Sequence, residues 1–511
     1  MRSFKQIIGL GGLSFVLVAC AIDQPGINPF PNEFYFPTGL ALDPVRPVLY
    51  VGNTNADLRF NGGTIMALDI SALPGDLSKI GDEVKASRLN CEAGRIEAGR
   101  WECDEAQFVI SDATIRTGNF PGELRISSKG DRLYAPVRGE NHLLWMDIVQ
   151  TSQTTGKVDL RCNADVFLGC GAVPNDTNCM AWDCGAENRV DYSSVARERL
   201  ASDPFGIALN ELVAVHVNAE GQRQTCRDGA STVPCDCGSA AACPEPDSGL
   251  PMSNCCIDAP DGDHIYLAHL SGGEISFAFA NDSGVELRDV SGNVFNTSSS
   301  VKGGFSVEPS LPGDARSPIF AGSRTSSQLA SFVIWDDTRV VSGSQTSVSL
   351  VSPASGQYFD VRGVARAPGG KQLFVVSRSP PTMIAVDLSL DENGDSKREP
   401  MWAVELCADP SLLRTIPNPA HANDPTALLA LVVCFGEEQI YVVDTKLAEV
   451  VGRVFTGRGP HVLEIDAPNQ RAFVANFLDN TVGVIDLNPE RSTYLQMVLQ
   501  IGYVSQLEQN L

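Results

Sequence analysis

Four arginines and two histidines occupy related places in the chain, and together they offer the chemistry of anion recognition. Each stands next to a short run of β-branched and aromatic residues; they are Arg138, His269, Arg324, Arg362, Arg378 and His461. A guanidinium group donates paired hydrogen bonds to a carboxylate or a phosphate. If the fold gathers these side chains, they predict a site for a small anionic or polar ligand. The competing interpretation is that the arginines pair with nearby aspartates and only stabilise the fold.

The short runs beside these residues form a repeated unit. Its clearest copy contains three segments, 459–465, 470–476 and 480–487, which are rich in Val, Ile and Phe and are separated by Pro, Asn, Asp and Gly. This pattern predicts three consecutive antiparallel strands. Related triplets begin near residues 36, 120, 203, 304, 362 and 409, which gives seven units in all. The units near 304 and 409 match the pattern least well.

The unit resembles the YVTN-type β-propeller repeat. In that repeat an aliphatic-Tyr-Val-Ala-Asn strand precedes a Val-x-Val-Ile-Asp strand, and the matching segments here are 471–476 and 481–486. The resemblance extends from about Phe36 to the C-terminus and implies a propeller fold. Similar propellers serve as lactonases, redox-cofactor enzymes and binding scaffolds, so the resemblance implies no single activity.

Elementary packing leads to the same architecture. A sheet of three or four strands cannot bury both of its faces alone, whereas radial stacking of such sheets buries the faces and leaves only short edges. We therefore expect an all-β chain whose residues 35–511 form a seven-bladed β-propeller with disulfide-rich loop insertions. The last outer strand is expected near residues 494–499. The alternative is a pair of β-sandwiches.

A propeller would place the six cationic residues on one face. The starts of first strands and the ends of second strands surround the same mouth of the central channel, together with residues such as Asn53, Asn476, Thr38 and Phe205. We therefore predict that the six side chains converge there.

The N-terminal segment has the pattern of a bacterial lipoprotein signal. Arg2 and Lys5 precede an apolar run, 7–19, which is shorter than the roughly 20 residues of a membrane-spanning helix. The run ends in Leu-Val-Ala-Cys, which resembles a lipobox. We expect a signal peptide at 1–19, an acylated Cys20 and a tether at 20–34, with Ala21 favouring the outer membrane. The alternative is an ordinary signal peptide, and the leaflet is open.

The composition limits the classes of partner that the protein is expected to bind. The formal net charge is −24, with 62 acidic and 38 basic residues. Such a chain lacks the basic surface that nucleic acid or anionic lipid would attract. We expect attachment to the membrane through the N-terminal lipid, and a protein or envelope polymer as partner.

The cysteines predict disulfides in three insertions and in the sixth blade. Fourteen of the fifteen remain when Cys20 is set aside, in a compartment where disulfides persist. They fall into even groups, in insertions of about 71–105, 149–200 and 210–262 and around blade six. Cys407 is predicted to pair with Cys434, because antiparallel pairing brings these strand ends together, and Cys91 with Cys103. The other pairings are open.

The insertions are expected in loops between first and second or third and fourth strands, which emerge on one face. We therefore predict a disulfide-pinned cap over blades one to three. Zinc and covalent haem are not expected, because no histidine completes a metal-binding set and Cys-x-x-Cys-His is absent.

One acidic loop resembles the front of a calcium-binding loop. Oxygen-bearing side chains alternate at Asp391, Asn393 and Asp395, shortly after Asp387, and Gly394 provides the turn. The distal acidic ligand is absent, because Trp402 stands at its place. An ordinary Asn-Gly turn explains the pattern equally well. No cofactor is otherwise expected.

The favoured function is that of an envelope lipoprotein whose propeller acts as a binding scaffold. The alternatives are a propeller enzyme, such as a lactone hydrolase, or a binder of small anions or metal ions at the channel mouth. The chain contains no Gly-x-Ser-x-Gly or His-Glu-x-x-His motif. Since propeller enzymes assemble sites from scattered residues, the sequence does not decide whether the protein is an enzyme.

Overall fold

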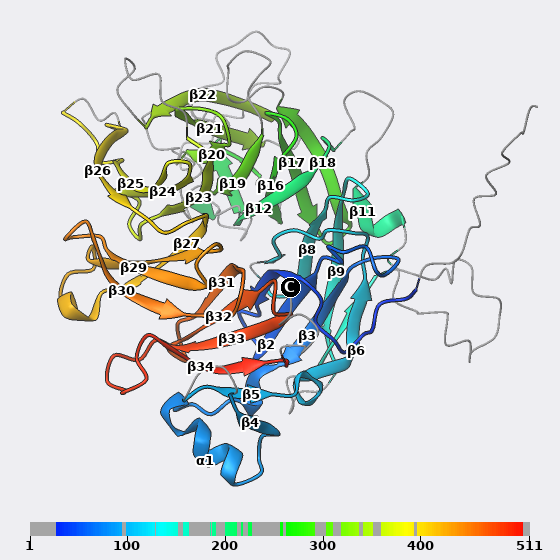
Figure 1. Cartoon of the computed structure of the whole chain (residues 1–511). Coiled ribbons are helices and arrows are strands. Elements are labelled where there is room, and N and C mark those ends of the chain that lie inside the picture. Colours follow the sequence, from blue (N-terminus) through cyan, green and yellow to red (C-terminus); the bar gives the residue numbers. More distant parts are fainter. Residues whose placement is uncertain are drawn as a thin grey trace, which may run out of the picture.

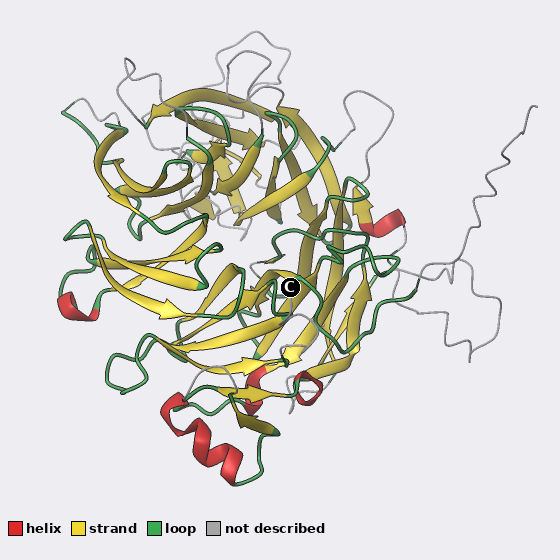
Figure 2. Ribbon diagram, in the orientation of Figure 1, coloured by secondary structure: helices red, strands yellow, loops and turns green. Residues whose placement is uncertain are grey.

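Seven antiparallel sheets stand around a central axis in the computed structural model of the chain (Figures 1 and 2). The prediction of an all-β, seven-bladed β-propeller is confirmed. The structure describes residues 27–503 with gaps at 95–98, 128, 152–156, 163–183, 185, 191–199, 212–215, 218–222, 227–255, 259–261, 292–302, 310–317, 337–340, 351–358 and 393–395. Cys20 and the predicted signal peptide at 1–19 lie outside the described residues.

Blades one to four follow the predicted order. Blade one contains β1 (Pro37–Leu42), β2 (Val48–Asn53), β3 (Thr64–Asp69) and β6 (Val109–Arg116). Blade two contains β7 (Arg125–Ile126), β8 (Arg132–Val137), β9 (His142–Gln150), β10 (Val158–Arg161) and β11 (Arg189–Val190). Blade three contains β12 (Pro204–Glu211), β16 (Asp263–His269), β17 (Ile275–Asn281) and β18 (Gly284–Ser291). Blade four contains β19 (Gly304–Glu308), β20 (Ile319–Ser323), β21 (Gln328–Asp336) and β22 (Val341–Ser349).

Blades five to seven are the most regular. Blade five contains β23 (Val361–Arg366), β24 (Gln372–Arg378), β25 (Pro381–Asp387) and β26 (Glu399–Glu405). Blade six contains β27 (Pro410–Pro417), β28 (Leu428–Cys434), β29 (Gln439–Asp444) and β30 (Glu449–Phe455). Blade seven contains β31 (Pro460–Asp466), β32 (Arg471–Asn476), β33 (Thr481–Asp486) and β34 (Gln496–Ile501), the last being the predicted outer strand.

Burial explains why the strands have these sequences. In β28 and β32 every residue is buried, because neighbouring blades cover both faces of the inner strands. The outer strand β30 instead alternates exposed and partly buried residues along most of its length. Apolar residues therefore fill the space between blades, and the core is a ring of interfaces rather than one centre.

A backbone hydrogen bond recurs in all seven blades and aligns them. A residue at the end of the second strand or directly after it donates its N–H to the carbonyl oxygen of a residue that precedes the first strand, at 2.8–3.2 Å. The donor–acceptor pairs are Thr54–Phe36, Arg138–Phe120, Leu270–Asp203, Arg324–Gly303, Arg378–Asp360, Phe435–Asp409 and Phe477–Gly459. These pairs define what we call the upper face, and they show which residues are equivalent around it.

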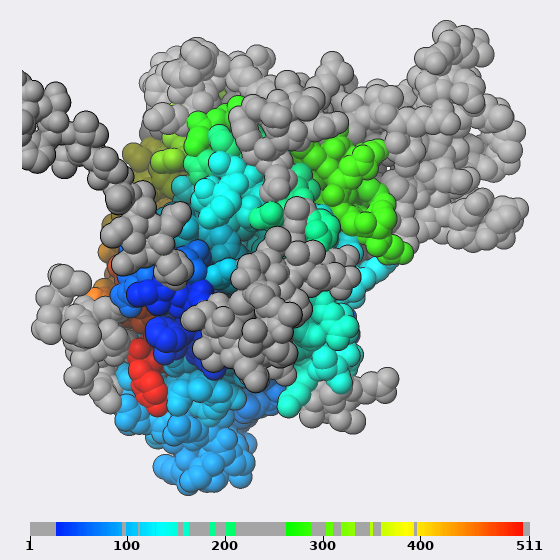
Figure 3. Space-filling view, turned by 90° about the vertical axis from the view of Figure 1, so that its right-hand side faces the viewer, coloured from blue at the N-terminus to red at the C-terminus, as the bar shows by residue number. Residues whose placement is uncertain are grey.

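The first insertion extends blade seven. It contains the helix α1 (Ile80–Lys85) and two strands, β4 (Cys91–Ala93) and β5 (Trp101–Cys103), and β5 pairs in parallel with β34. Figure 3 shows the C-terminal residues against the N-terminal part of the chain. The predicted Cys91–Cys103 disulfide is confirmed, with Cα atoms 4.0 Å apart. The expectation that this insertion caps blades one to three is wrong, because the pairing holds it beside blade seven.

The second insertion interrupts an outer strand. Arg161 of β10 pairs with Asp147 and Arg189 of β11 pairs with Leu144, so β10 and β11 are successive parts of one strand against β9. Residues 162–188 leave between them, and a Cys162–Cys184 disulfide closes the base. This insertion therefore starts from the edge of blade two and not from the expected loop.

The third insertion leaves from the expected loop, between β12 and β16 of blade three. Within it β13 (His216–Val217), β14 (Arg223–Cys226) and β15 (Cys256–Asp258) form a separate three-stranded sheet. Most of its cysteines lie outside the described residues. Short 3₁₀ turns complete the described structure at Ile70–Ala72, Leu77–Lys79, Glu105–Gln107, Ala186–Asn188 and Pro419–His421.

Candidate functional site

A cavity of about 340 Å³ opens at the upper end of the central channel, and we call it the upper chamber. Four of the six predicted cationic residues line it: Arg138, Arg362, Arg378 and His461. The other lining residues are Thr38, Thr54, Ala56, Phe120, Pro121, Phe205, Phe305, Asp409, Pro410, Ser411, Phe435 and Phe477. The chamber therefore combines positive charge with an aromatic wall.

His269 does not reach the upper chamber. It is the last residue of β16, one position before the residue equivalent to Arg138, and successive strand side chains point to opposite faces. Its ring is fully buried, with Nδ1 3.1 Å from the Ser202 carbonyl oxygen and Nε2 2.7 Å from Ser276 Oγ. Burial lowers the pKa of His269 to about 4. The prediction that His269 lines the channel mouth is therefore wrong, because its position in the strand is offset by one residue from that of Arg138.

Arg324 also lies outside the chamber lining. It follows β20 at the position equivalent to Arg138 and Arg378, and its Nε lies 3.9 Å from Asp360 Oδ1. It contributes charge to the upper face without contacting the chamber.

Each chamber arginine has an aspartate partner. Arg138 pairs with Asp203 at 2.6 Å, Arg362 with Asp360 at 2.8 Å and Arg378 with Asp409 at 2.7 Å. These aspartates immediately precede the first strands of blades three, five and six. The predicted pairing of these arginines with aspartates is thus present in the structure.

The charges around the chamber remain unbalanced, however. Three aspartates serve four arginines among the described residues, because Arg324 and Arg362 share Asp360. Burial lowers the pKa of Arg362, the charges of Arg324 and Arg378 lower it further, and Asp360 opposes the shift. Burial and then the charges of Arg362 and Arg138 lower the pKa of His461 to about 4. The upper face around the chamber therefore carries excess positive charge from Arg324, which together with the neutral imidazole favours an anionic ligand.

Aromatic rings form the floor and wall. Phe205 and Phe305 have ring centroids 4.4 Å apart, and Phe205 lies 6.3 Å from His461. The guanidinium of Arg362 lies over the Phe305 ring at 4.7 Å, and that of Arg138 lies 5.8 Å from the Phe205 ring. These contacts hold the cations against apolar faces, so a ligand would meet both at once.

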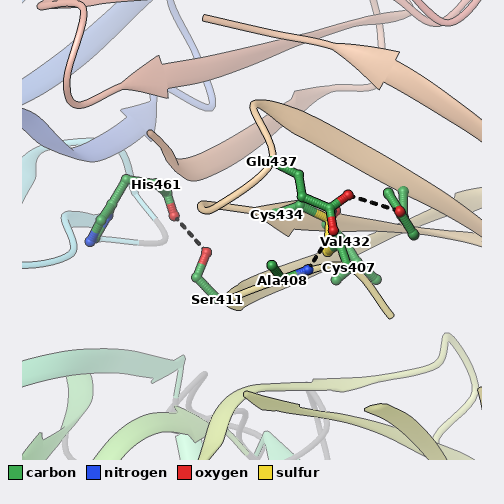
Figure 4. The surroundings of a disulfide bond; sticks show 8 residues. Cys407, Ala408, Ser411, Val432, Cys434, Glu437 and His461 are labelled. Atoms are coloured by element: carbon green, nitrogen blue, oxygen red, sulfur yellow. Dashed lines mark hydrogen bonds between the residues drawn. A yellow bond between two sulfur atoms is a disulfide. The ribbon is translucent and has the colours of Figure 1, made fainter. Parts of the chain in front are cut away.

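His461 is held with one ring nitrogen toward the protein. Its Nδ1 lies 3.2 Å from the Thr38 carbonyl oxygen, which only accepts, so Nδ1 carries the hydrogen in the neutral ring and Nε2 is the acceptor. Ser411 Oγ donates to the His461 carbonyl oxygen at 3.4 Å (Figure 4). The predicted Cys407–Cys434 disulfide lies nearby and is confirmed. It joins the chain before β27 to the end of β28, next to Asp409 and Phe435.

A second cavity, of about 590 Å³, lies at the opposite end of the channel, and we call it the lower chamber. One residue from the same register position of each first strand lines it: Ala41, Arg125, Ala208, Glu308, Ala365, Arg414 and Glu464. Glu123 and Arg366 also line it. This ring was not predicted from the sequence, because the predicted site residues all stand at strand ends. Charged residues in the middle of buried first strands were the available signal.

The acidic loop after β25 is only partly described. The Asp387 carboxylate accepts from the Ser389 N–H at 2.8 Å and lies 3.3 Å from Lys397 Nζ. Asn393 and Asp395 lie outside the described residues, so the calcium loop stays a prediction. Within the described ranges, no group of three or more His, Cys, Asp or Glu residues is placed to hold a metal ion. No helix there is long and apolar enough to span a membrane.

No family model and no curated protein matches this sequence. Similar solved structures include a candidate 6-phosphogluconolactonase from Bacteroides uniformis, at 12% identity and a TM-score of 0.47 over 86% of this chain and 92% of that one. The periplasmic gluconolactonase PpgL of Pseudomonas aeruginosa aligns at 10% identity and a TM-score of 0.43, over 89% and 92%. The Swd1 β-propeller domain of Myceliophteria thermophila aligns at 10% and 0.45, over 89% and 98%. At such low identity and TM-score, none of these similarities assigns an activity to this chain.

Proposed function

We propose that this protein is a lipid-anchored binding protein of the bacterial cell envelope, and that its upper chamber holds a small anion with an apolar or aromatic body. The observation that carries this proposal is the meeting of Arg138, Arg362 and Arg378 with phenylalanine rings in one cavity of about 340 Å³. Small-molecule sites have volumes of roughly 300–1,000 Å³ and combine apolar walls with a few polar anchors.

Arg362 is the best-placed anchor. Its side chain is only 10% exposed, one terminal nitrogen donates to Asp360, and its Nε has no hydrogen-bond partner among the described residues. A buried donor without a partner costs free energy, which an incoming anion would recover. Arg378, whose side chain is 43% exposed, would contribute less.

The membrane anchor is part of the proposal. Residues 1–19 would be removed, Cys20 would carry the acyl chains and 20–34 would be the tether, with the outer membrane as destination. The described part of the tether packs on blade one, where Asn28 Oδ1 accepts from Asn61 Nδ2 at 2.9 Å and from Arg116 at 3.0 Å. The stretch from Cys20 to Ile27 spans at most about 25 Å, which would keep blade one near the bilayer.

His461 supports an alternative function in catalysis. A neutral imidazole with an accepting Nε2 would act there as a general base in hydrolysis, for example of a lactone, but its pKa of about 4 makes it a weak one. The binding role is favoured because Asp409, the carboxylate in the chamber lining, is paired with Arg378. A protein or envelope-polymer partner stays a prediction.

The binding proposal is tested by calorimetric titration of the purified protein with benzoate, and with benzyl alcohol as its uncharged counterpart. We expect benzoate to bind and benzyl alcohol to bind at least about tenfold more weakly, the difference of one charge-assisted hydrogen bond. Arg362→Met should lose this preference, and Arg88→Met, which changes an exposed arginine paired with Glu83, should keep it. Equal binding of both probes by the wild type would overturn the proposal.

A further inference from the structure

We propose that the lower chamber is a second ligand site, which takes a small organic cation such as a primary amine with Glu308 as its counter-ion. This site lies at the other end of the channel from the upper chamber and does not depend on the function proposed there. Its volume, about 590 Å³, is ample for a small polar molecule.

Four charged residues that line the lower chamber compensate one another. Arg125 pairs with Glu123 at 3.1 Å, and Arg414 pairs with Glu464 at 2.8 Å. Arg125 also lies 3.6 Å from Glu464, so these four residues form one connected network of ion pairs. Two positive and two negative charges cancel, and this network has little need of a charged ligand.

Glu308 lies outside that network. Among the described residues its carboxylate accepts one hydrogen bond, from the backbone N–H of Arg366 at 3.1 Å. The Arg366 guanidinium donates instead to the carbonyl oxygens of Pro309 and Pro318 and lies over the Phe320 ring at 5.0 Å, and it acts on the Glu308 carboxylate only at longer range. A carboxyl group without a direct cationic partner therefore faces the cavity, and a ligand cation would supply that partner.

The positive charges near Glu308 do not offset the effect of burial on the pKa of its carboxyl group. The charged groups that face it from other first strands are Arg366, Arg414 and Arg125, with Glu123 and Glu464 beyond. Burial nevertheless raises the pKa of Glu308 to about 7, because the guanidinium groups act at a distance or are shared with the two other glutamates. Since an amine stays protonated over this range, cation binding should strengthen as the pH rises through 7.

The two chambers are separate. Phe205 comes from blade three and His461 from blade seven, on opposite sides of the ring, and both line the upper chamber only. Closely packed first strands lie below them: a Cβ on Gly206 would come within 2.4 Å of the Phe305 carbonyl oxygen. Ligands at the two ends should therefore bind without displacing each other.

The test is a titration of the purified protein with 1,4-diaminobutane, and with 1,4-butanediol as the uncharged counterpart. We expect the diamine alone to bind, about tenfold more tightly at pH 8 than at pH 6, because the competent ionised fraction of Glu308 changes by that factor. Glu308→Gln should abolish the preference for the diamine and its pH dependence. Glu399→Gln, the same change on an exposed residue of β26, should leave both intact.

Arg362→Met separates this inference from the proposed function, because it should weaken benzoate binding by at least about tenfold and leave diamine binding unchanged. Absence of diamine binding to the wild type would overturn the inference, and so would unaltered binding to Glu308→Gln. Wild-type binding that does not change between pH 6 and pH 8 would also overturn it, without reliance on any variant.

Discussion

Phe205 and His461 face each other across the channel axis, with ring centroids 6.3 Å apart. Because their blades stand on opposite sides of the ring, this contact divides the channel into an aromatic, cationic upper chamber and a lower chamber of mixed charge. Phe205 also packs on Phe305 at 4.4 Å and is almost fully buried.

Phe205→Ala should destabilise the fold and alter the upper chamber. Loss of a buried phenylalanine lowers the free energy of unfolding by about 3 kcal/mol. Urea denaturation measures this change, and Phe455→Ala, at an exposed position of β30, provides the control with little expected effect. An unchanged unfolding midpoint in Phe205→Ala would show that the two rings do not hold the channel together.

The two arginines of blade five should differ in their effect on anion binding. Arg362→Met should weaken benzoate binding by at least about tenfold, because a buried charge-assisted hydrogen bond is lost. Arg378→Met should weaken it by less than about threefold, because exposed charges are screened by solvent. Titration calorimetry of both variants measures the ratio, and the reverse order would contradict the placement of Arg362 as the anchor.

The disulfide of blade six should contribute strongly to stability. Cys407 and Cys434 are 27 residues apart, and closing a loop of that length restricts the unfolded chain by about 3.5 kcal/mol. The double variant Cys407→Ala/Cys434→Ala should lose about that much free energy of unfolding, measured in urea. Wild-type protein treated with a thiol reductant should approach the same value, and a loss below about 1 kcal/mol would go against this account.

Glu308 should make the folded protein less stable as the pH rises from about 4.5 to about 7. Its pKa is raised to about 7 in the folded protein, from an ordinary value near 4.5, so the folded state holds this proton more tightly than the unfolded state does. The resulting stabilisation is present below pH 4.5 and is lost as the pH rises to 7.

Glu308→Gln keeps the neutral form at every pH. The variant should therefore match the wild type near pH 4.5 and exceed its stability at pH 8, as measured by thermal unfolding at both values. The difference between the two proteins isolates Glu308 from His461, whose lowered pKa acts in the opposite sense. Equal stability at pH 8 would refute the raised pKa.

Cys20→Ser should release the protein from the membrane. Acyl chains on Cys20 would hold the wild type in the membrane fraction and incorporate labelled palmitate, whereas a serine cannot be acylated in this way. Fractionation of a bacterial host and palmitate labelling measure both effects, with Cys91→Ser as the control that keeps Cys20. Soluble, unlabelled wild-type protein would mean that residues 1–19 act as an ordinary signal peptide.

The strands were predictable because inner strands of a propeller bury both faces and their apolar runs are conspicuous. The Cys407–Cys434 pair was predictable for a related reason, since antiparallel pairing brings the ends of β27 and β28 together. The orientation of His269 was not, because it depends on a one-residue register that only the recurring backbone hydrogen bond reveals.

The lower chamber and the positions of the insertions depend on contacts between distant segments. Glu308 belongs to blade four and Glu464 to blade seven, and no local sequence pattern links such distant residues. The pairing of β5 with β34 joins residues near 100 to residues near 500. Local periodicity carries no information about such a pairing.

The pairing of β5 with β34 determines when the ring of blades can close. The Cys91–Cys103 hairpin precedes β6 in the chain and can form before blade one is complete, whereas its partner strand β34 belongs to blade seven. The seam between blades one and seven can therefore close only after β34 has been synthesised, when it pairs with the hairpin that formed earlier. A chain truncated before Gln496 would leave the Cys91–Cys103 hairpin without its partner strand, and blade seven would lack its outer strand.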